Sequence, residues 1–272
     1  MNVEELKKIC TSVRIETLNS IVEAGSGHIG GSFSMVEMLV ALYFEVMNID
    51  PAKPKKNDRD RFVLSKGHAC PALYAVLAAR GFFPMEALKT ERKLGSILQG
   101  HPDSKVCPGI EASSGSLGQG ISIAAGMALG AKIRGTSENV YTIIGDGECS
   151  EGQVWESAEA AAHYELDNFT VLLDHNGLQI DGTNEEVMNP RDLSAKFAAF
   201  GFETIDVADG NDIEQVLAAL KTQRKSGMPR FLNCYTKKGA GVSFMENQLA
   251  WHAKQPTPEE YAAAIKELEA KQ

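Results

Sequence analysis

Residues 143–182 read IIGDGECSEGQVWESAEAAAHYELDNFTVLLDHNGLQIDG. Short apolar runs at residues 140–144 and 169–174 are predicted to be buried strands, and residues 154–163 between them have helical spacing. A strand, a helix and a strand joined by short links are typical of a βαβ unit with parallel strands. Continuous apolar strands also indicate a sheet that is covered on both faces.

The same alternation continues along the chain. We expect further strands at residues 202–207 and 230–236. Helices are expected at residues 6–22, 35–46 with Ser34 as N-cap, 71–80 ended by Gly81, 117–133, 193–200, 213–224 and 258–270. Residues 51–61 are expected to form a polar surface loop. The prediction is an α/β fold, a parallel β-sheet flanked by helices, in a single domain over residues 1–272.

Composition excludes several classes of protein. Hydrophobic residues make up 43% and charged residues 23% of the 272 residues, which is ordinary for a globular protein. A formal net charge of -9 argues against binding to nucleic acid or to an anionic membrane surface. No apolar run approaches the roughly 18 residues of a membrane span, and the N-terminus lacks the apolar core of a signal peptide.

The cysteines indicate the compartment. The chain has five, none in a CxxC pair, and a reduced cytoplasmic setting is the simplest interpretation: Cys10, Cys70, Cys107, Cys149 and Cys234. Cys149 stands beside the glycine motif, and we interpret it as a packing residue because free thiols are usually buried.

Polar residues follow both strands of the quoted unit. Gly145-Asp146-Gly147 ends the first strand, and Asn176 follows the second, 30 positions after Asp146. Both side chains are therefore expected at the carboxyl edge of the sheet, where open α/β sheets bind ligands. One carboxylate, one amide oxygen and a backbone carbonyl suit Mg²⁺, which takes its remaining oxygens from phosphate and water. The helix that starts near Glu151 directs its N-terminus to the same edge and favours an anion.

A purely structural alternative exists for this motif. An isolated GDG occurs in many loops, and an aspartate at a strand end is often a helix cap. The GDG followed by a long spacer and an asparagine turn after a buried strand is a much rarer combination, and it favours a metal–diphosphate site.

Four of the six histidines lie in turns flanked by glycine, proline or tryptophan: His28, His68, His101 and His252. Each could cap a turn or lie on the surface, while a zinc site lacks the close ligand spacing that zinc needs. His163 is interpreted as a helix residue and His175 as a turn residue.

From SGHIGG at Ser26 to WHAK at Trp251, the sequence resembles the thiamine-diphosphate enzymes, and transketolase most closely. The resemblance implies the thiamine-diphosphate-binding (PP) fold. Asp146, Asn176 and the backbone carbonyl of Leu178 then resemble the metal ligands, for Mg²⁺ or in its place Ca²⁺ or Mn²⁺. Gly147 would lie against the diphosphate and Ile180 against the cofactor rings.

The resemblance also gives roles to the histidines. His28 and His252 would hydrogen-bond the sugar, His68 would contact the diphosphate, and His101 would face the substrate end near the thiazolium. A neutral imidazole can donate and accept at once, which suits proton movement around a ketose carbonyl.

SSGSLGQG, at Ser113 to Gly120, resembles the loop beside the thiamine rings, so Gly115, Ser116 and Leu117 would contact the cofactor. Many family members carry proline where this chain has Ser116. A dinucleotide-binding GxGxxG motif is set aside because no convincing strand precedes the loop. Lys238 could meet the substrate or face water, and water is favoured.

The chain resembles only the N-terminal domain of the family. The resemblance implies the N-terminal subunit of a split transketolase, active only with a C-terminal subunit that carries the pyrimidine-binding domain, the activating glutamate and sugar-phosphate arginines. A heterotetramer is expected, in which Glu151 lies at a subunit interface; its structural alternative is a helix N-terminal carboxylate.

The expected reaction is transfer of a two-carbon ketol unit from a ketose phosphate to an aldose phosphate, as in the pentose phosphate pathway. Another thiamine-diphosphate enzyme, related to deoxyxylulose-phosphate synthase or to dehydrogenase E1, is one alternative. A non-catalytic diphosphate-binding module is the other.

Overall fold

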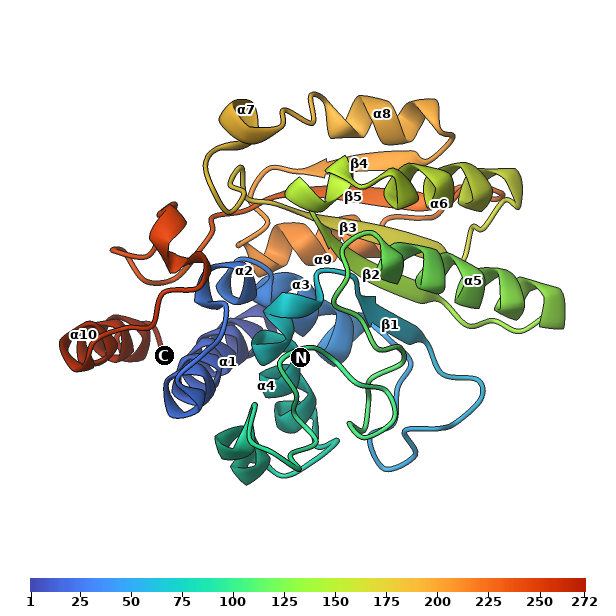
Figure 1. Ribbon diagram of the computed structural model, residues 1–272. Helices are drawn as coiled ribbons and strands as arrows, with labels where there is room; N and C mark the ends of the chain where they lie inside the picture. Colours follow the sequence, from blue (N-terminus) through green and yellow to red (C-terminus); the bar gives the residue numbers. More distant parts are fainter.

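The computed structural model describes residues 1–272, and a five-stranded parallel sheet with the order β1-β2-β3-β5-β4 forms its centre (Figure 1). The strands are β1 (Arg61–Leu64), β2 (Val140–Gly145), β3 (Phe169–His175), β4 (Glu203–Val207) and β5 (Arg230–Tyr235). Gly145 pairs with Asp174 in the β2–β3 ladder. The two polar positions predicted from the sequence therefore follow neighbouring strand ends, and the predicted fold class is confirmed.

Ten α-helices surround the sheet. Their bounds are α1 (Val3–Ala24), α2 (Ile29–Phe33), α3 (Val36–Ala41), α4 (Cys70–Arg80), α5 (Gln119–Arg134), α6 (Gly152–His163), α7 (Asn184–Val187), α8 (Leu193–Ala199), α9 (Ile213–Lys221) and α10 (Pro258–Glu269). Helix α3 continues as a π-helical turn over Leu42–Val46. None of the helices has the length and hydrophobicity that a bilayer crossing demands.

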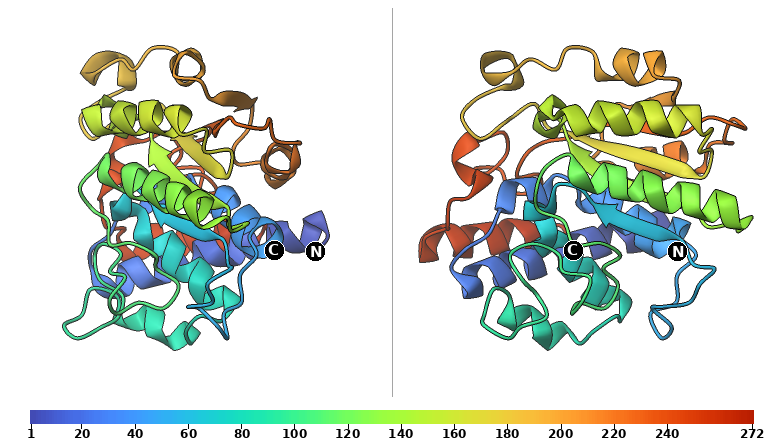
Figure 2. Two further views of the ribbon diagram at one scale, coloured as in Figure 1. Left: turned by 90° about the vertical axis from the view of Figure 1, so that its right-hand side faces the viewer. Right: turned by 45° about the vertical axis from the view of Figure 1, so that its right-hand side comes forward.

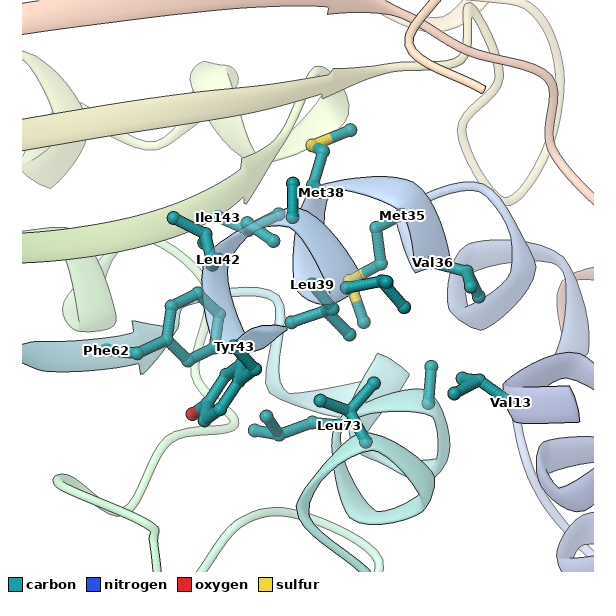
Figure 3. Close-up of a cluster of buried hydrophobic side chains, with 14 of the residues drawn as sticks. Val13, Met35, Val36, Met38, Leu39, Leu42, Tyr43, Phe62, Leu73 and Ile143 are labelled. Carbon is teal, nitrogen blue, oxygen red and sulfur yellow. The ribbon is translucent and has the colours of Figure 1, made fainter. Parts of the chain in front are cut away.

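Strand alternation divides the core between the two faces of the sheet. Phe62 and Leu64 of β1 point into one cluster with α1, α3, α4 and α9, whereas Val63 points into the other with α5, α6 and α8. Figure 3 shows the first cluster, in which Tyr43 lies edge-on to Phe62 at 5.6 Å between ring centroids. Because both faces are covered, the strands can be apolar throughout.

A third cluster attaches the C-terminal helix. Ala264 and Leu268 of α10 pack with Leu18 and Ile21 of α1, and Trp251 closes the group. Figure 2 shows α10 lying beside α1, away from the sheet. Helix α10 begins with a capping box, in which Thr257 and Glu260 satisfy each other's backbone N–H groups. This packing brings the Leu249–His252 turn close to the start of α2.

The structure corrects three predictions of local backbone structure. Residues 61–64, where the sequence predicts no strand, form β1, which is too short to show periodicity. Ser34 is not an N-cap; its hydroxyl donates to Gly31 O and to Asp174 Oδ2. His175 ends β3 and pairs with Asn233 of β5 at 2.9 Å rather than lying in a turn. The single domain over residues 1–272 stays a prediction.

Candidate active site

A cavity of about 400 Å³ opens where the carboxyl ends of β1, β2, β3 and β5 meet. Ten of the candidate site residues line it: His28, His68, Gly115, Leu117, Asp146, Gly147, Asn176, Leu178, Ile180 and His252. Parallel strands place their carboxyl ends at one edge, and ligands bind in that crevice. The sequence therefore located the cavity through side chains that come from separate parts of the chain.

Asp146 is buried and receives three hydrogen bonds. Its Oδ1 accepts from Gly147 N at 2.9 Å, and its Oδ2 accepts from Gly177 N at 2.6 Å and from Asn184 Nδ2 at 2.9 Å. Burial and then the nearby Asp174 raise the pKa of this carboxyl, while the hydrogen bonds lower it. A divalent cation would relieve the repulsion between the two carboxylates.

Asp174 determines which way Asn176 faces. The Asn176 Nδ2 group donates to Asp174 Oδ2 at 3.2 Å, which turns Asn176 Oδ1 away from Asp174, where it accepts from Leu178 N at 3.2 Å and could also ligate a metal. Asp174 is itself fully buried and also accepts from Ser34 and from Thr236. A carboxylate, an amide oxygen and a carbonyl near the same strand ends fit a hard divalent cation such as Mg²⁺.

Lys238 differs from its prediction, because its side chain is buried in the cavity and does not face water. Its Nζ donates to the carbonyl of Leu178 at 3.4 Å, so a cationic group already lies against the carbonyl expected to ligate metal. Burial and then the charge of Lys66 lower the pKa of Lys238 to about 8. The contact shows that the Leu178 carbonyl faces a position suited to positive charge.

Lys66 is a second buried cation that sequence reasoning missed. It follows β1, its Nζ lies 2.5 Å from Asp174 Oδ2 and 2.8 Å from Gly31 O, and it lines the cavity. Lys66 belongs to the SKGH segment that also contains His68. Because no strand was predicted before this segment, there was no reason to place Lys66 at the sheet edge. Lys66 and Lys238 both line the cavity, and two cationic groups there suit a diphosphate.

Glu148, also missed, joins three loops of the cavity. Its Oε1 accepts from Ser65 Oγ at 2.5 Å and from Gly118 N at 2.8 Å, and its Oε2 accepts from Gly145 N at 3.0 Å. Burial raises the pKa of this carboxyl against the lowering effect of those bonds. Glutamate is rarely buried in proteins, so nothing in the local sequence indicates this role.

Glu148→Gln is expected to weaken cofactor binding about tenfold, because a glutamine amide would turn an N–H group toward the Gly145 N–H. The free energy of unfolding should fall by about 1–3 kcal/mol. Calorimetric titration and urea unfolding measure the two effects. Glu159→Gln on the exposed face of α6 is the matched control. Wild-type values for both quantities in Glu148→Gln would contradict the role of Glu148 in joining the loops.

The SSGSLGQG loop is fastened at both ends. Ser114 Oγ donates to Leu64 O at 2.6 Å, and Gly118, at φ +79°, is the N-cap of α5. A Cβ on Gly120 would lie 2.5 Å from Ser65 Cα, so only glycine permits this approach of helix to strand end. Gly115 and Leu117 of this loop line the cavity, whereas Ser116 is exposed outside the lining.

His28, His68 and His252 form a triad of rings in the cavity. Their ring centroids lie 5.0 Å apart for His28–His68, 5.2 Å for His28–His252 and 5.4 Å for His68–His252. The Nδ1 atoms of His28 and His252 are buried and lack a hydrogen-bond partner within the protein. Buried polar atoms usually have partners, so these two nitrogens are an exception within the ring cluster, and a ligand in the cavity would meet the rings at their accessible atoms.

All three rings are held neutral near pH 7. Burial is the largest cause, and it lowers the pKa of His28 to about 4, of His68 to about 2 and of His252 to about 4. The charges of nearby cations lower the three pKa values further. The largest such effect comes from Arg92 on His28, from Lys66 on His68 and from Lys238 on His252. A neutral imidazole keeps one donor and one acceptor.

The triad predicts a pH dependence of stability. Unfolded histidines titrate near pH 6.5, so between about pH 6.5 and 4 the unfolded chain binds protons that the folded triad does not. The free energy of unfolding of the cofactor-free protein should therefore fall as pH decreases through this window. Urea unfolding at pH 7 and 5 tests it, with His68→Gln expected to show a smaller decrease than wild type. An equally reduced decrease in His163→Gln, at the end of α6, would show that the triad is not the cause.

Two further candidates lie, like Ser116, outside the cavity lining. His101 is exposed but packs against Gly115, where an added Cβ would lie 3.1 Å from His101 Cδ2. Glu151 is the exposed N-cap of α6 and makes no capping bond with its side chain. Ile180, by contrast, lines the cavity and is 66% exposed, so its apolar side chain is free to contact a ligand or another chain.

Cys149 is buried, and burial raises the pKa of its thiol well above the ordinary range. Its Sγ donates to Gly145 O at 3.5 Å behind the glycine turn. The structure thus places it as a packing residue, as predicted.

A larger cavity, of about 570 Å³, lies elsewhere, between α1 and the segment after β5. It contains the buried Arg14–Glu37 pair, in which both Nη groups of Arg14 donate to the carboxylate, at 2.6 and 2.7 Å. No histidine lines it. The chemistry of the side chains therefore favours the smaller cavity as the active site.

Comparison with known proteins identifies relatives. Residues 6–269 match the family described as transketolase, thiamine diphosphate binding domain. An apulose-4-phosphate transketolase subunit of Phocaeicola vulgatus is 41% identical over 98% of this chain and 95% of that protein. A 6-deoxy-6-sulfo-D-fructose transketolase subunit of Clostridium sp. strain MSTE9 is 43% identical over 97% of this chain and 96% of that protein.

A solved structure gives the same result. Transketolase from Campylobacter jejuni superimposes with a TM-score of 0.93 at 29% identity, over 99% of this chain and 43% of that chain. This chain therefore spans less than half the length of that enzyme.

Proposed function

The chain belongs to the family of transketolase thiamine-diphosphate-binding domains, and we propose that it is the N-terminal subunit of a split transketolase. The observation that carries the proposal is the meeting of the Asp146–Asn176 strand edge with the histidine triad in one cavity. The reaction is transfer of a two-carbon ketol unit from a ketose to an aldose, in a cytoplasmic setting that suits five free, buried cysteines.

In this proposal Asp146, Asn176 and the Leu178 carbonyl hold Mg²⁺, and His68, Gly147 and the two lysines of the cavity bind the diphosphate. The loop at Gly115, Ser116 and Leu117 and the side chain of Ile180 contact the rings. When bound, the cofactor supplies a carbanion-stabilising centre for the two-carbon fragment.

In this proposal the histidines contact the substrate. His28 and His252 line the cavity, where a ring nitrogen of each can hydrogen-bond sugar hydroxyls and the carbonyl oxygen. His101 stands at the rim of the loop that contains Gly115, where it can reach the substrate near the thiazolium. Their neutral state lets each imidazole accept a proton from one atom and donate to another.

The partner completes the site in this proposal. It carries the pyrimidine-binding domain, and the two chains form a heterotetramer in which Glu151 lies at an interface. The named relatives are called subunits, which supports a second chain. Light scattering of the two chains mixed together measures the assembly state, and a persistent monomer of this chain would contradict it.

The relatives also widen the range of donor sugars to be tested. Apulose 4-phosphate and 6-deoxy-6-sulfo-D-fructose appear in the names of two of them, so both are substrates to be tested beside xylulose 5-phosphate. The proposed chemistry at the two-carbon unit is the same for each donor.

The test is a ketol-transfer assay with these three donors, ribose 5-phosphate as acceptor, Mg²⁺ and thiamine diphosphate. It is run with this chain alone and with the candidate C-terminal subunit, and products are measured by mass spectrometry. Activity in the mixture alone is the expected result. Activity of this chain alone would contradict the split site, and silence from an assembled mixture would favour a non-catalytic role.

A further inference from the structure

Arg92 has a strained backbone near the histidines. Its φ is +59°, a left-handed conformation that non-glycine residues rarely adopt, and its N–H donates to Leu98 O at 2.8 Å. Such strain persists only where the surrounding structure enforces it, and it is concentrated at functional positions. The strained turn follows the Met85–Thr90 turn, and the Arg92 side chain is only 23% exposed.

The side chain of Arg92 contacts two turns that each lead to a histidine. Its Nη1 donates to Ser26 Oγ at 3.2 Å, two residues before His28. Its Nη2 donates to Gly100 O at 3.4 Å, one residue before His101. The guanidinium also packs on Gly100, where an added Cβ would lie 3.1 Å from the Arg92 Cζ.

A buried carboxylate faces the other side of the guanidinium. Glu91 Oε1 lies 3.9 Å from Arg92 Nε, and neither atom has another partner within the protein. The second carboxylate oxygen of Glu91 accepts from the Ser20 hydroxyl on α1. Glu91 is almost fully buried, and burial raises the pKa of its carboxyl to about 7, so it is a polar neighbour of Arg92 and not a further hydrogen-bond partner.

We propose that Arg92 is a positioning residue, whose guanidinium holds the Ser26–His28 turn and the Gly100–His101 turn together so that both histidines face one substrate. The substrate part of this role rests on the proposed function, whereas the contacts themselves do not. Arginine suits the role because its planar fork can bond two partners at once, which a lysine ammonium on a flexible stem does less well.

The charge of Arg92 has a second effect on the same residues. After burial, it is the largest influence that lowers the pKa of His28 and of His101. His101, Lys238 and Lys66 lower the pKa of His28 further, and the rings of His68 and His252 also face it, at 5.0 and 5.2 Å between centroids. A protonated imidazole cannot accept a hydrogen bond, so this charge keeps both rings able to do so.

The first test uses the cofactor-free chain and NMR titration of its histidines. Arg92→Met is expected to raise the pKa of both His28 and His101, because it removes the cation that lowers both. Arg92→Lys keeps the charge and should leave both values near wild type. Lys93→Met, which removes the neighbouring exposed lysine that pairs with Glu23, is the matched control. Unchanged values in Arg92→Met would overturn the electrostatic part of the proposal.

The second test measures amide hydrogen exchange in the two turns. Arg92→Lys and Arg92→Met should both speed exchange about tenfold in the turns at residues 25–28 and 99–101, because both lose the double contact. Gly100→Ala should do the same without removing charge, since its Cβ would displace the guanidinium. Unchanged exchange in all three variants would overturn the positioning role. Arg92→Lys and Gly100→Ala still decide it if Arg92→Met does not fold.

The third test uses the reconstituted complex. Arg92→Lys should lower kcat/KM for ketol transfer about tenfold while cofactor affinity stays within about twofold of wild type. If Arg92→Lys instead lowered cofactor affinity as much as kcat/KM and also lowered thermal stability, Arg92 would act in folding and the proposal would be overturned. An inactive wild-type complex would contradict the proposed function, whereas the titration and exchange results would still decide the role of Arg92.

Discussion

Replacing Asp146 by alanine is expected to weaken binding of Mg²⁺ with thiamine diphosphate by on the order of 100-fold or more. Asp146 supplies the charged oxygen of the proposed metal site, and the other two oxygens are neutral. Its carboxylate also orders the backbone after β3 through Gly177 N. Alanine removes the charge and leaves buried N–H groups without acceptors, so both the metal and the shape of its site are lost.

Calorimetric titration of the isolated chain measures this effect, with His28→Ala as the comparison. His28 lies in the same cavity but has no proposed contact with the metal, so its loss should change cofactor affinity less than about threefold. Equal losses in the two variants would contradict the assignment of roles.

Asp146→Asn separates charge from shape. The amide keeps the size of the side chain and removes the repulsion from Asp174, but its NH2 group would face an N–H group that the carboxylate accepts, so the cofactor-free protein should lose about 1–3 kcal/mol of stability while metal binding collapses. Urea unfolding without cofactor measures this, and a large loss of stability would mean that Asp146 acts mainly in folding.

Lys66→Met is expected to destabilise the protein by about 3–5 kcal/mol at pH 7, because it leaves the Asp174 carboxylate buried without its cation. The side chains of Lys66 and Asp174 are 3% and 0% exposed, and water cannot replace the lost partner. Burial opposes ionisation of Asp174, but Lys66, Ser34 and Thr236 together hold the pKa of Asp174 below its usual value. Urea or thermal unfolding measures the loss.

The pH dependence of Lys66→Met identifies the cause. In wild type the lowered pKa of Asp174 stabilises the fold above the unfolded value near 3.9 and is lost as pH falls through the folded value. In Lys66→Met burial dominates and raises that pKa above the unfolded value, so the folded variant takes up a proton first. Its deficit should shrink between pH 7 and 5, and Lys66→Met with Asp174→Asn should recover part of the stability. A deficit independent of pH and of Asp174 would show that lost packing is responsible.

Local patterns predicted most of the fold. Strands β2, β3, β4 and β5 lie within one or two residues of the predicted runs, and α4 ends at Gly81, at φ +88°, as expected. Apolar runs bounded by turns reveal such elements because burial on both faces leaves no room for polar residues. Strand β1 was not predicted, because four residues are too few to show a hydrophobic period. Its place in the sheet depends on pairing with β2, whose first residue lies 79 positions after the first residue of β1.

The candidate site also contains residues that local sequence predicts and residues whose position depends on distant parts of the chain. Asp146 and Asn176 could be placed together because strand direction alone brings their ends to one edge. Lys66, Lys238 and Glu148 could not, since their burial depends on loops that approach from distant parts of the sequence. The resemblance identified the histidines, but only the three-dimensional structure shows that three of them form a triad and that His101 stands apart.

The strand order has a consequence for how the chain acquires its structure during synthesis. Strand β4 pairs only with β5, which is made later, so the β1-β2-β3 half of the sheet can assemble while β4 still lacks a partner. Pairing that spans long loops is slow, and an unpaired strand edge invites association with other chains. We therefore expect an intermediate with an open β3 edge until residues 230–235 arrive. Pulse-labelled hydrogen exchange during refolding should show β4 and β5 gaining protection together, after β2; protection of β4 before β5 would contradict this order.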